Sequence, residues 1–257
     1  MVLRRLGNKQ KIAKEIIQYF PKHDIYFEPF FGAGGMFFSK TKARYNYVND
    51  FDEDVYNLFM VLSQSKDELL ELAELMPIHN RLWQHWQKNR ESDPIRKALR
   101  FLMLSNFGYM GQPEALRFRP DNSKKILLNK IKLTHERIKD VRFNNCDFRD
   151  FFKRYSISDK QEKAFIYCDP PYLDTVNNYS SGFTKEDSND LFDVLQETGI
   201  KWAMSEFDHP FILKQAKERG LNVIHIGERQ NIKNRRTEIL VINYENRQLS
   251  LFGQTEN

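Results

Sequence analysis

The chain alternates strand-like and helix-like segments near both ends, but this alternation stops for a long stretch in the middle. Strand-like apolar runs fall at residues 25–28, 45–49, 141–144, 164–168, 200–205, 222–226 and 238–243. Helix-like segments among them cover residues 11–20, 36–40, 185–197 and 210–219. In the middle, residues 54–76, 82–87 and 94–104 have only helical periodicity. Because strands that alternate with helices predict a largely parallel sheet, we expect an α/β domain interrupted by a mostly helical block.

A glycine-rich turn follows the first predicted strand. It reads Glu28-Pro29-Phe30-Phe31-Gly32-Ala33-Gly34-Gly35, and a short helix, the second strand and Asp50 come after it. Glycines let a backbone approach a ligand closely, and an acid at the tip of the second strand can hold a ribose diol. The third glycine of a dinucleotide site is replaced by Phe37, and no Gly-Lys-Ser/Thr phosphate loop is present. We therefore expect a nucleoside ligand without phosphates.

A second turn, Asp169-Pro170-Pro171-Tyr172, follows the apolar run at residues 164–168 and is called the cassette below. Its prolines have no backbone N–H, so the segment cannot continue a sheet ladder. The Asp169 carboxylate and the Pro170 carbonyl can each accept one N–H of an exocyclic amine, while Tyr172 stacks on the heterocycle. The alternative is a structural turn with Tyr172 in the core. Both turns follow the carboxyl ends of strands, where open α/β sheets bind ligands.

Charge favours a polyanionic partner. The 257 residues include 40 Lys+Arg and 35 Asp+Glu, for a net charge of +5. Residues 117–142 alone hold nine basic side chains against three acids, so the rest of the chain is close to neutral. Such a run is either a solvated surface or a contact for nucleic acid.

Other patterns exclude several classes of protein. Cys146 and Cys168 lack metal-ligand spacing, and the six histidines form no zinc motif, so we expect neither a metal site nor a disulfide scaffold. No apolar run reaches the roughly 20 residues that span a bilayer, and no signal peptide is present, so a cytoplasmic location is expected. Trp83 and Trp86 stand at helical spacing, which favours the core over base stacking.

Four motifs in one order resemble the Dam-type (D12 class, alpha group) S-adenosylmethionine-dependent DNA adenine-N6 methyltransferases. They are Gly7-Asn8-Lys9, the turn at residues 28–35, the helical insertion and the cassette, and the resemblance covers residues 5–244. It implies a Rossmann-like methyltransferase sheet with a catalytic domain at residues 1–54 and 136–257, and a target-recognition domain inserted at residues 55–135. The implied reaction moves a methyl group from S-adenosylmethionine to N6 of an adenine flipped out of double-stranded DNA, without a metal.

The resemblance also implies roles for single residues. Contacts to S-adenosylmethionine would come from Lys9, Phe27, Glu28, Pro29, Phe30, Gly32, Gly34, Asp50, Asp147, Phe148 and Asp169. Of these, Asp50 would hold the ribose, and Asp147 would meet the cofactor adenine with Phe148 beside the ring. The target base would be held by the catalytic residues Asp169, Pro170, Pro171 and Tyr172. Arg5 departs from the pattern, because many relatives have an aromatic side chain there.

Contacts to DNA are expected from residues that are basic or aromatic, namely Tyr109, Arg117, Arg119, Lys124, Lys125, Tyr179, Arg235 and Arg236. Arginine is the favoured base reader, because it makes bidentate bonds to guanine. The turn at residues 106–111 resembles the first half of the recognition hairpin in GATC-specific relatives, but the second half is missing, so GATC is not supported. Tyr179 and Phe183 either fill the gap left by the flipped base or belong to the core.

The last residues carry a further resemblance. Gln248, Leu249, Leu251 and Phe252 lie in a Gln-Leu-Ser-Leu-Phe segment that resembles the peptide by which bacterial proteins dock on the sliding clamp. The alternative is a terminal segment that packs on its own domain. A cognate restriction endonuclease is a second partner to consider. Rival functions are a methyltransferase of RNA or of cytosine N4 with the same cassette, and a non-catalytic DNA-binding relative.

Overall fold

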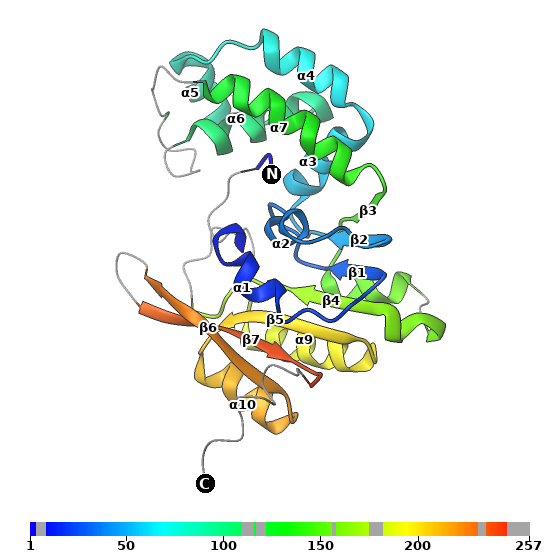
Figure 1. The fold of residues 1–257 in the computed structure, drawn as a ribbon. Coiled ribbons are helices and arrows are strands. Elements are labelled where there is room, and N and C mark those ends of the chain that lie inside the picture. Colours follow the sequence, from blue (N-terminus) through cyan, green and yellow to red (C-terminus); the bar gives the residue numbers. More distant parts are fainter. Residues whose placement is uncertain are drawn as a thin grey trace. The chain divides into compact units, whose positions relative to one another are not determined.

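The computed structural model describes residues 1–3, 9–108, 116, 122–155, 158–174, 182–230 and 235–245. Its strands form a seven-stranded sheet in the order β3-β2-β1-β4-β5-β7-β6 (Figure 1). Their bounds are β1 Ile25–Glu28, β2 Tyr45–Asn49, β3 Val141–Asn144, β4 Ala164–Cys168, β5 Lys201–Phe207, β6 Asn222–Gln230 and β7 Arg235–Ile242. Every predicted strand is present, and the last two are longer than the sequence pattern suggested.

The middle of the sheet is parallel. β4 pairs in parallel with β1 on one side and with β5 on the other. β7 runs antiparallel between β5 and β6. The strand order reverses between β1 and β4, which is the switch point at which doubly wound sheets bind ligands beyond the strand carboxyl ends. The expected α/β fold is confirmed, and the cassette directly follows β4 at this switch point.

The chain divides into two compact units. The first comprises Met1–Lys11, Phe31–Lys42 and Val48–Asn145, and the second comprises Ile12–Phe30, Ala43–Tyr47 and Cys146–Asn257. Helices of the first unit are η1 Lys9–Lys11, α2 Gly35–Ser39, α3 Glu53–Gln64, α4 Lys66–Leu75, α5 Asn80–Lys88, α6 Pro94–Phe107 and α7 Ser123–Ile138. Helices of the second are α1 Ala13–Ile17, α8 Phe148–Phe151, η3 Phe152–Arg154, η4 Ser158–Lys163, α9 Lys185–Glu197 and α10 Pro210–Glu218.

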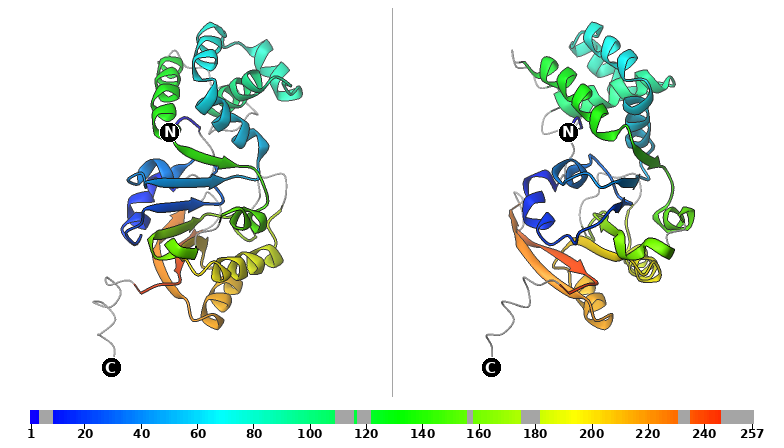
Figure 2. Two further views of the ribbon diagram at one scale, coloured as in Figure 1. Left: turned by 90° about the vertical axis from the view of Figure 1, so that its right-hand side faces the viewer. Right: turned by 45° about the vertical axis from the view of Figure 1, so that its right-hand side comes forward.

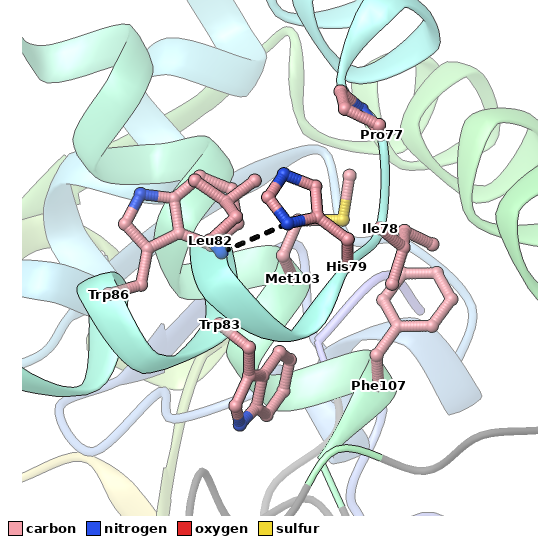
Figure 3. Close-up of a pocket in the computed structure, with 8 residues that line it drawn as sticks. All are labelled: Pro77, Ile78, His79, Leu82, Trp83, Trp86, Met103 and Phe107. Atoms are coloured by element: carbon pink, nitrogen blue, oxygen red, sulfur yellow. Dashed lines mark hydrogen bonds between the residues drawn. The ribbon is translucent and has the colours of Figure 1, made fainter.

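The first unit contains the predicted helical block. In it, α3 and α4 both pack against α6 and α7, as the blue-to-green ribbons of Figure 2 show. Trp83 and Trp86 of α5 are buried, which confirms that they belong to the core. A pocket beside them is lined by Pro77, Ile78, His79, Leu82, Trp83, Trp86, Met103 and Phe107 (Figure 3). The helical character of this block is confirmed, whereas the domain boundaries at residues 54 and 136 stay predictions.

Two predicted helices are longer than the helices that the structure shows. The segment at residues 11–20 holds the last residue of η1 and then α1, and Ile12 between them has no side chain that can accept a backbone N–H. The segment at residues 54–76 is split at Ser65, whose φ of −131° is not helical. Ser65 donates its backbone N–H to the Val61 carbonyl at the end of α3, and α4 begins directly after it.

The second unit has a continuous apolar core. Its fully buried side chains include Phe27 of β1, Ile166 of β4 and Trp202 of β5. Within the described ranges no helix combines the length and the apolarity of a membrane span. The same residues contain no cluster of His, Cys, Asp and Glu that would hold a metal ion.

Candidate active site

The glycine turn of the first unit is tied to Asp50 by backbone hydrogen bonds. The Gly32 N–H donates to one carboxylate oxygen of Asp50 over 2.5 Å, and the Asp52 N–H donates to the other over 2.9 Å. The Asn145 side-chain amide also donates to the Asp50 carbonyl over 2.8 Å. The Asp50 carboxylate, half-buried at the tip of β2, is therefore held in one orientation by local chain.

Gly32 and Gly34 both adopt positive φ angles, of 52° and 72°. A Cβ at Gly34 would lie 2.6 Å from the Phe38 ring and 2.8 Å from the Phe31 ring, so only glycine fits there. A Cβ at Gly32 would meet no atom within 4 Å, which leaves its backbone open to the approach of a ligand. Lys9, 3 % exposed, begins η1, which packs against α2 directly after this turn.

The end of β1 belongs to the second unit and carries a buried acid. Glu28 is 2 % exposed and accepts a hydrogen bond from the Tyr26 hydroxyl over 2.8 Å. Burial, with the charge of Glu28, raises the pKa of Tyr26 well above its usual value, so this hydroxyl stays a donor. Pro29 is buried as well. The Phe27 ring lies fully in the core, stacked 5.0 Å from Tyr47, so only its backbone can serve the predicted cofactor contact.

The cassette leaves β4 beside the end of β1. Phe27 of β1 pairs with Ile166 of β4 in parallel register, so Glu28 and Asp169 emerge at the same edge. Asp169 is half-buried, Pro170 is buried and Pro171 is half-buried. The thiol of Cys168 has its pKa raised by burial and by the charges of Glu28 and Asp169, which makes it a poor nucleophile.

Tyr172 is a buried side chain of the cassette. It is 8 % exposed, its hydroxyl donates to Glu238 of β7 over 2.5 Å, and its ring lies edge-on to Phe207, with 4.6 Å between centroids. Burial and the charges of Asp169 and Glu238 raise the pKa of Tyr172 well above its usual value. The hydroxyl is therefore protonated, and its hydrogen bond anchors the tip of the ring.

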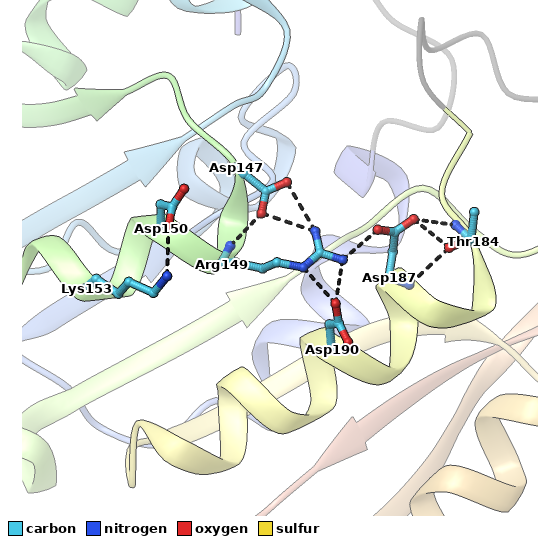
Figure 4. A network of polar contacts seen from close by, with 7 residues as sticks. All are labelled: Asp147, Arg149, Asp150, Lys153, Thr184, Asp187 and Asp190. Atoms are coloured by element: carbon cyan, nitrogen blue, oxygen red, sulfur yellow. Dashed lines mark hydrogen bonds and ion pairs between the residues drawn. The ribbon is translucent and has the colours of Figure 1, made fainter.

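Asp147 caps α8 and belongs to a network of charged side chains. Its carboxylate accepts the Arg149 N–H over 2.9 Å and pairs with the Arg149 guanidinium over 3.2 Å. The same guanidinium bonds Asp187 over 2.6 Å and Asp190 over 2.8 Å, both on α9 (Figure 4). Burial opposes the charge of Arg149, but the three acids outweigh it and raise its pKa. Arg149 therefore links the predicted adenine contact, Asp147, to the start of α9.

Three aromatic rings gather next to Asp147. Phe30 lies 5.6 Å from Phe148 and 6.0 Å from Phe183, and Phe148 lies 6.1 Å from Phe183, measured between ring centroids. Phe30 and Phe183 are only half-buried. The structure thus brings two predicted cofactor residues together with Phe183, which packs on the edge of the core.

The predicted DNA contacts lie in different surroundings. Lys124 donates its ammonium to the carbonyls of Glu74 and Met76 over 2.6 and 2.8 Å, so it closes the end of α4. Lys125 is exposed on α7. Arg235 begins β7, and Arg236 donates to the backbone after the cassette. The remaining predicted DNA contacts, Tyr109, Arg117, Arg119 and Tyr179, lie outside the described residues. The predicted clamp residues Gln248, Leu249, Leu251 and Phe252 lie outside them as well.

Sequence reasoning missed Arg149 and Glu238. Arg149 is hidden among many basic residues, and its partners on α9 are about 40 positions away. Glu238 had a visible signal, since an acid stands at the head of the apolar run 239–242, where a buried charge needs a partner.

Comparison with known proteins gives the family. Residues 6–237 match the model described as D12 class N6 adenine-specific DNA methyltransferase. A DNA adenine methylase of Vibrio cholerae is 26 % identical over 248 residues, 86 % of each chain. The type II methyltransferase M1.LlaDCHI of Lactococcus lactis is 26 % identical over 275 residues, 93 % of this chain and 94 % of that one. Among solved structures, the rRNA methyltransferase AviRa from Streptomyces viridochromogenes covers 91 % of this chain and 84 % of its own, with 11 % identity and a TM-score of 0.40.

The doubly wound sheet, with a glycine turn after its first strand, defines a class of α/β proteins that bind ligands beyond the carboxyl ends of the strands. Because the family model spans most of the sequence, the chain belongs to the D12 class of N6 adenine-specific DNA methyltransferases. Family membership confirms the predicted activity, with S-adenosylmethionine as methyl donor and DNA as substrate.

Proposed function

We propose that the cassette holds the N6 amine of an adenine flipped out of duplex DNA at a specific site, and that residues at the ends of β1 and β2 and at the start of α8 hold S-adenosylmethionine. The observation that carries the proposal is the parallel pairing of β1 with β4, which brings Glu28 and Asp169 to one edge of the sheet. A charged sulfonium donor and a neutral amine acceptor suit an edge lined by carboxylates.

The residues of the glycine turn and of α8 fit this donor. S-adenosylmethionine supplies an electrophilic sulfonium methyl group when bound. Asp50, held by two backbone amides, presents a fixed carboxylate for the two hydroxyls of a ribose. Half-buried Phe30 offers a ring face for the adenine with Phe148 beside it, and Asp147 accepts from its amine. Lys9, Gly32 and Gly34 keep backbone close to the remainder of the ligand.

The cassette acts on the acceptor. The Asp169 carboxylate and the Pro170 carbonyl each accept one N–H of adenine N6, which localises the nitrogen lone pair towards the methyl group. As the N–C bond forms and the S–C bond breaks, the N6 proton leaves towards Asp169. Tyr172 supplies one face or edge of its fixed ring to the extruded base, which offsets part of the few kcal/mol that flipping costs.

The test is transfer of labelled methyl from S-adenosylmethionine to unmethylated duplex DNA. Asp169→Ala is expected to lower transfer at least 1000-fold while DNA binding changes less than twofold, because the acceptor of N6 is lost and the DNA surface is not. The matched control is Asp67→Ala, since the Asp67 side chain is 88 % exposed on α4, and it should keep wild-type transfer. Wild-type transfer by Asp169→Ala would overturn the role of the cassette.

The same assay distinguishes adenine in DNA from two other methyl acceptors. RNA and cytosine N4 both present an exocyclic amine that the same cassette can hold. Transfer to RNA alone, or to cytosine alone, would overturn the adenine proposal.

Two partners complete the proposal. The segment at residues 248–252 would dock on the bacterial sliding clamp through Leu251 and Phe252. Purified clamp should retain the wild type and release Leu251→Ala and Phe252→Ala, and equal retention of all three would sink the idea. A restriction endonuclease of matching sequence specificity is the second proposed partner, and a cytoplasmic location is proposed with both.

A further inference from the structure

Strand β7 presents two charged side chains to one face of the sheet. Arg236 and Glu238 are two residues apart on this strand, so their side chains point the same way. Glu238 pairs in register with Phe207 on β5, which lies next to β4. Strand β7 begins more than 60 residues after the cassette. It therefore reaches the edge of the sheet from which the cassette emerges.

Glu238 contacts the cassette through Tyr172. It is 1 % exposed, and the Tyr172 hydroxyl donates to its Oε1 over 2.5 Å. The Tyr172 ring also meets Phe207 edge-on, with an interplanar angle of 80°. The hydrogen bond at the tip and the perpendicular ring at the side together fix the position of the Tyr172 ring.

Arg236 contacts the backbone that leaves the cassette. Its guanidinium donates to the carbonyls of Leu173 and Asp174 over 3.3 and 3.2 Å, and it lies over the Phe207 ring at 5.5 Å. Asp174 has a positive φ of 53°, and its carboxylate bonds His209 over 2.9 Å. The chain after Tyr172 is therefore held in a sharp turn from one side by β7.

We propose that β7 is the support of the target-base pocket, with Glu238 as the positioning residue that sets the ring of Tyr172 before the adenine arrives. This inference rests on the proposed function of the cassette. A carboxylate is costly to bury, so an apolar residue would be favoured at the head of this strand if only packing mattered. A buried glutamate at this position is explained if the flipped base needs the Tyr172 ring in one fixed position, within the tolerance of a near-attack geometry.

The test compares Glu238→Gln with Glu238→Leu. Glutamine keeps an oxygen that accepts from the Tyr172 hydroxyl, whereas leucine fills a similar volume and accepts nothing. We expect Glu238→Leu to lower kcat for methylation of unmethylated DNA at least tenfold, with KM for S-adenosylmethionine changed less than twofold. Glu238→Gln should keep at least one third of the wild-type kcat. The matched control is Glu228→Leu, an exposed glutamate on neighbouring β6, which should not lower kcat.

A double-mutant cycle separates positioning from general destabilisation. If Glu238 acts through the Tyr172 hydroxyl, Glu238→Leu should cause no further loss of kcat in a Tyr172→Phe background. Losses that multiply would overturn the proposal, as would wild-type kcat in Glu238→Leu. If the leucine variant fails to fold, Glu238→Asp decides: it withdraws the carboxylate by one methylene, and we expect kcat to fall at least fivefold. Wild-type kcat in Glu238→Asp would overturn the proposal.

An NMR measurement that does not depend on catalysis tests the role of Glu238 separately from the proposed function. With ¹³C-labelled tyrosine, the Cζ signal of Tyr172, which reports the hydrogen bond of the hydroxyl, should be similar in the wild type and in Glu238→Gln and should shift in Glu238→Asp and Glu238→Leu. Equal Cζ shifts in all four proteins would contradict the role of Glu238 even if the enzyme methylates adenine. A wild type that transfers no methyl to DNA would instead contradict the proposed function alone.

Discussion

The glycine turn and the cassette both follow strands of the same sheet, yet they are held in different ways. Asp50 is fixed by the backbone amides of Gly32 and Asp52, which lie 18 and 2 positions away. Tyr172 is fixed by side chains of Phe207 and Glu238, of which Glu238 is 66 positions away. The turn predicted to bind the cofactor is therefore set by backbone hydrogen bonds, and the turn predicted to hold the target base is set by side chains from distant strands.

This difference has a consequence for substitution. A turn that depends on glycine conformation tolerates almost no side chain, because its geometry is in the backbone itself. A turn that depends on side-chain contacts can be loosened by single changes elsewhere in the sheet while the fold persists. Substitutions in the glycine turn should therefore reduce cofactor affinity, whereas substitutions that loosen the cassette should reduce turnover.

Gly34→Ala should have the largest effect, and it acts on the glycine turn. The positive φ costs about 1–2 kcal/mol for a residue with a Cβ, and the new Cβ would collide with Phe31 and Phe38. We expect a marked fall in melting temperature and at least a tenfold loss of S-adenosylmethionine affinity, measured by differential scanning and titration calorimetry.

Gly220→Ala is the control for that change. Gly220 has a similar φ of 65°, but its Cβ would meet nothing within 4 Å. Only the backbone strain remains, so its fall in melting temperature should be smaller, and cofactor affinity should persist. Equal falls in the two variants would show that the packing of Phe31 and Phe38 does not constrain the turn.

Arg149→Met should have a smaller effect that depends on pH. Burial raises the pKa of Asp187, but bonds from Arg149 and Thr184 outweigh it and lower the pKa below its usual value. A lowered folded-state pKa stabilises the protein above the unfolded pKa, near 4, and this contribution is lost as pH falls through the folded value. The melting-temperature gap between wild type and Arg149→Met should therefore shrink from about pH 5 to about pH 3.

Lys153→Met provides the comparison for Arg149. Lys153 pairs with Asp150 over 2.9 Å, and both side chains are exposed, so its removal should leave the melting temperature almost unchanged at every pH. A pH-independent gap for Arg149→Met would show that the network around Asp147 stabilises by packing rather than by charge.

The sequence predicted the parts of the fold that are local. The strands were found because each is a short apolar run, and Asp50 was found because strand, glycine turn, helix, strand and acid stand in order. Tertiary contacts were not visible in the same way. Glu238 and Tyr172 meet only because β7 inserts antiparallel between β5 and β6, and no local pattern predicts that pairing.

Helix ends were the least predictable feature. Ser65 divides residues 54–76 into α3 and α4, although apolar periodicity continues across it.

Lys124 was expected at DNA because it is basic, yet it closes the end of α4 through two carbonyls that lie about 50 positions earlier. A charged side chain in a sequence does not reveal whether its partner is solvent, DNA or a helix terminus.

Mass spectrometry of nucleosides from unmethylated duplex DNA, incubated with the protein and S-adenosylmethionine, will show which base the cassette methylates. We expect N6-methyladenine with the wild type and none above background with Asp169→Ala. N4-methylcytosine as the product, or N6-methyladenine formed equally well by Asp169→Ala, would contradict it.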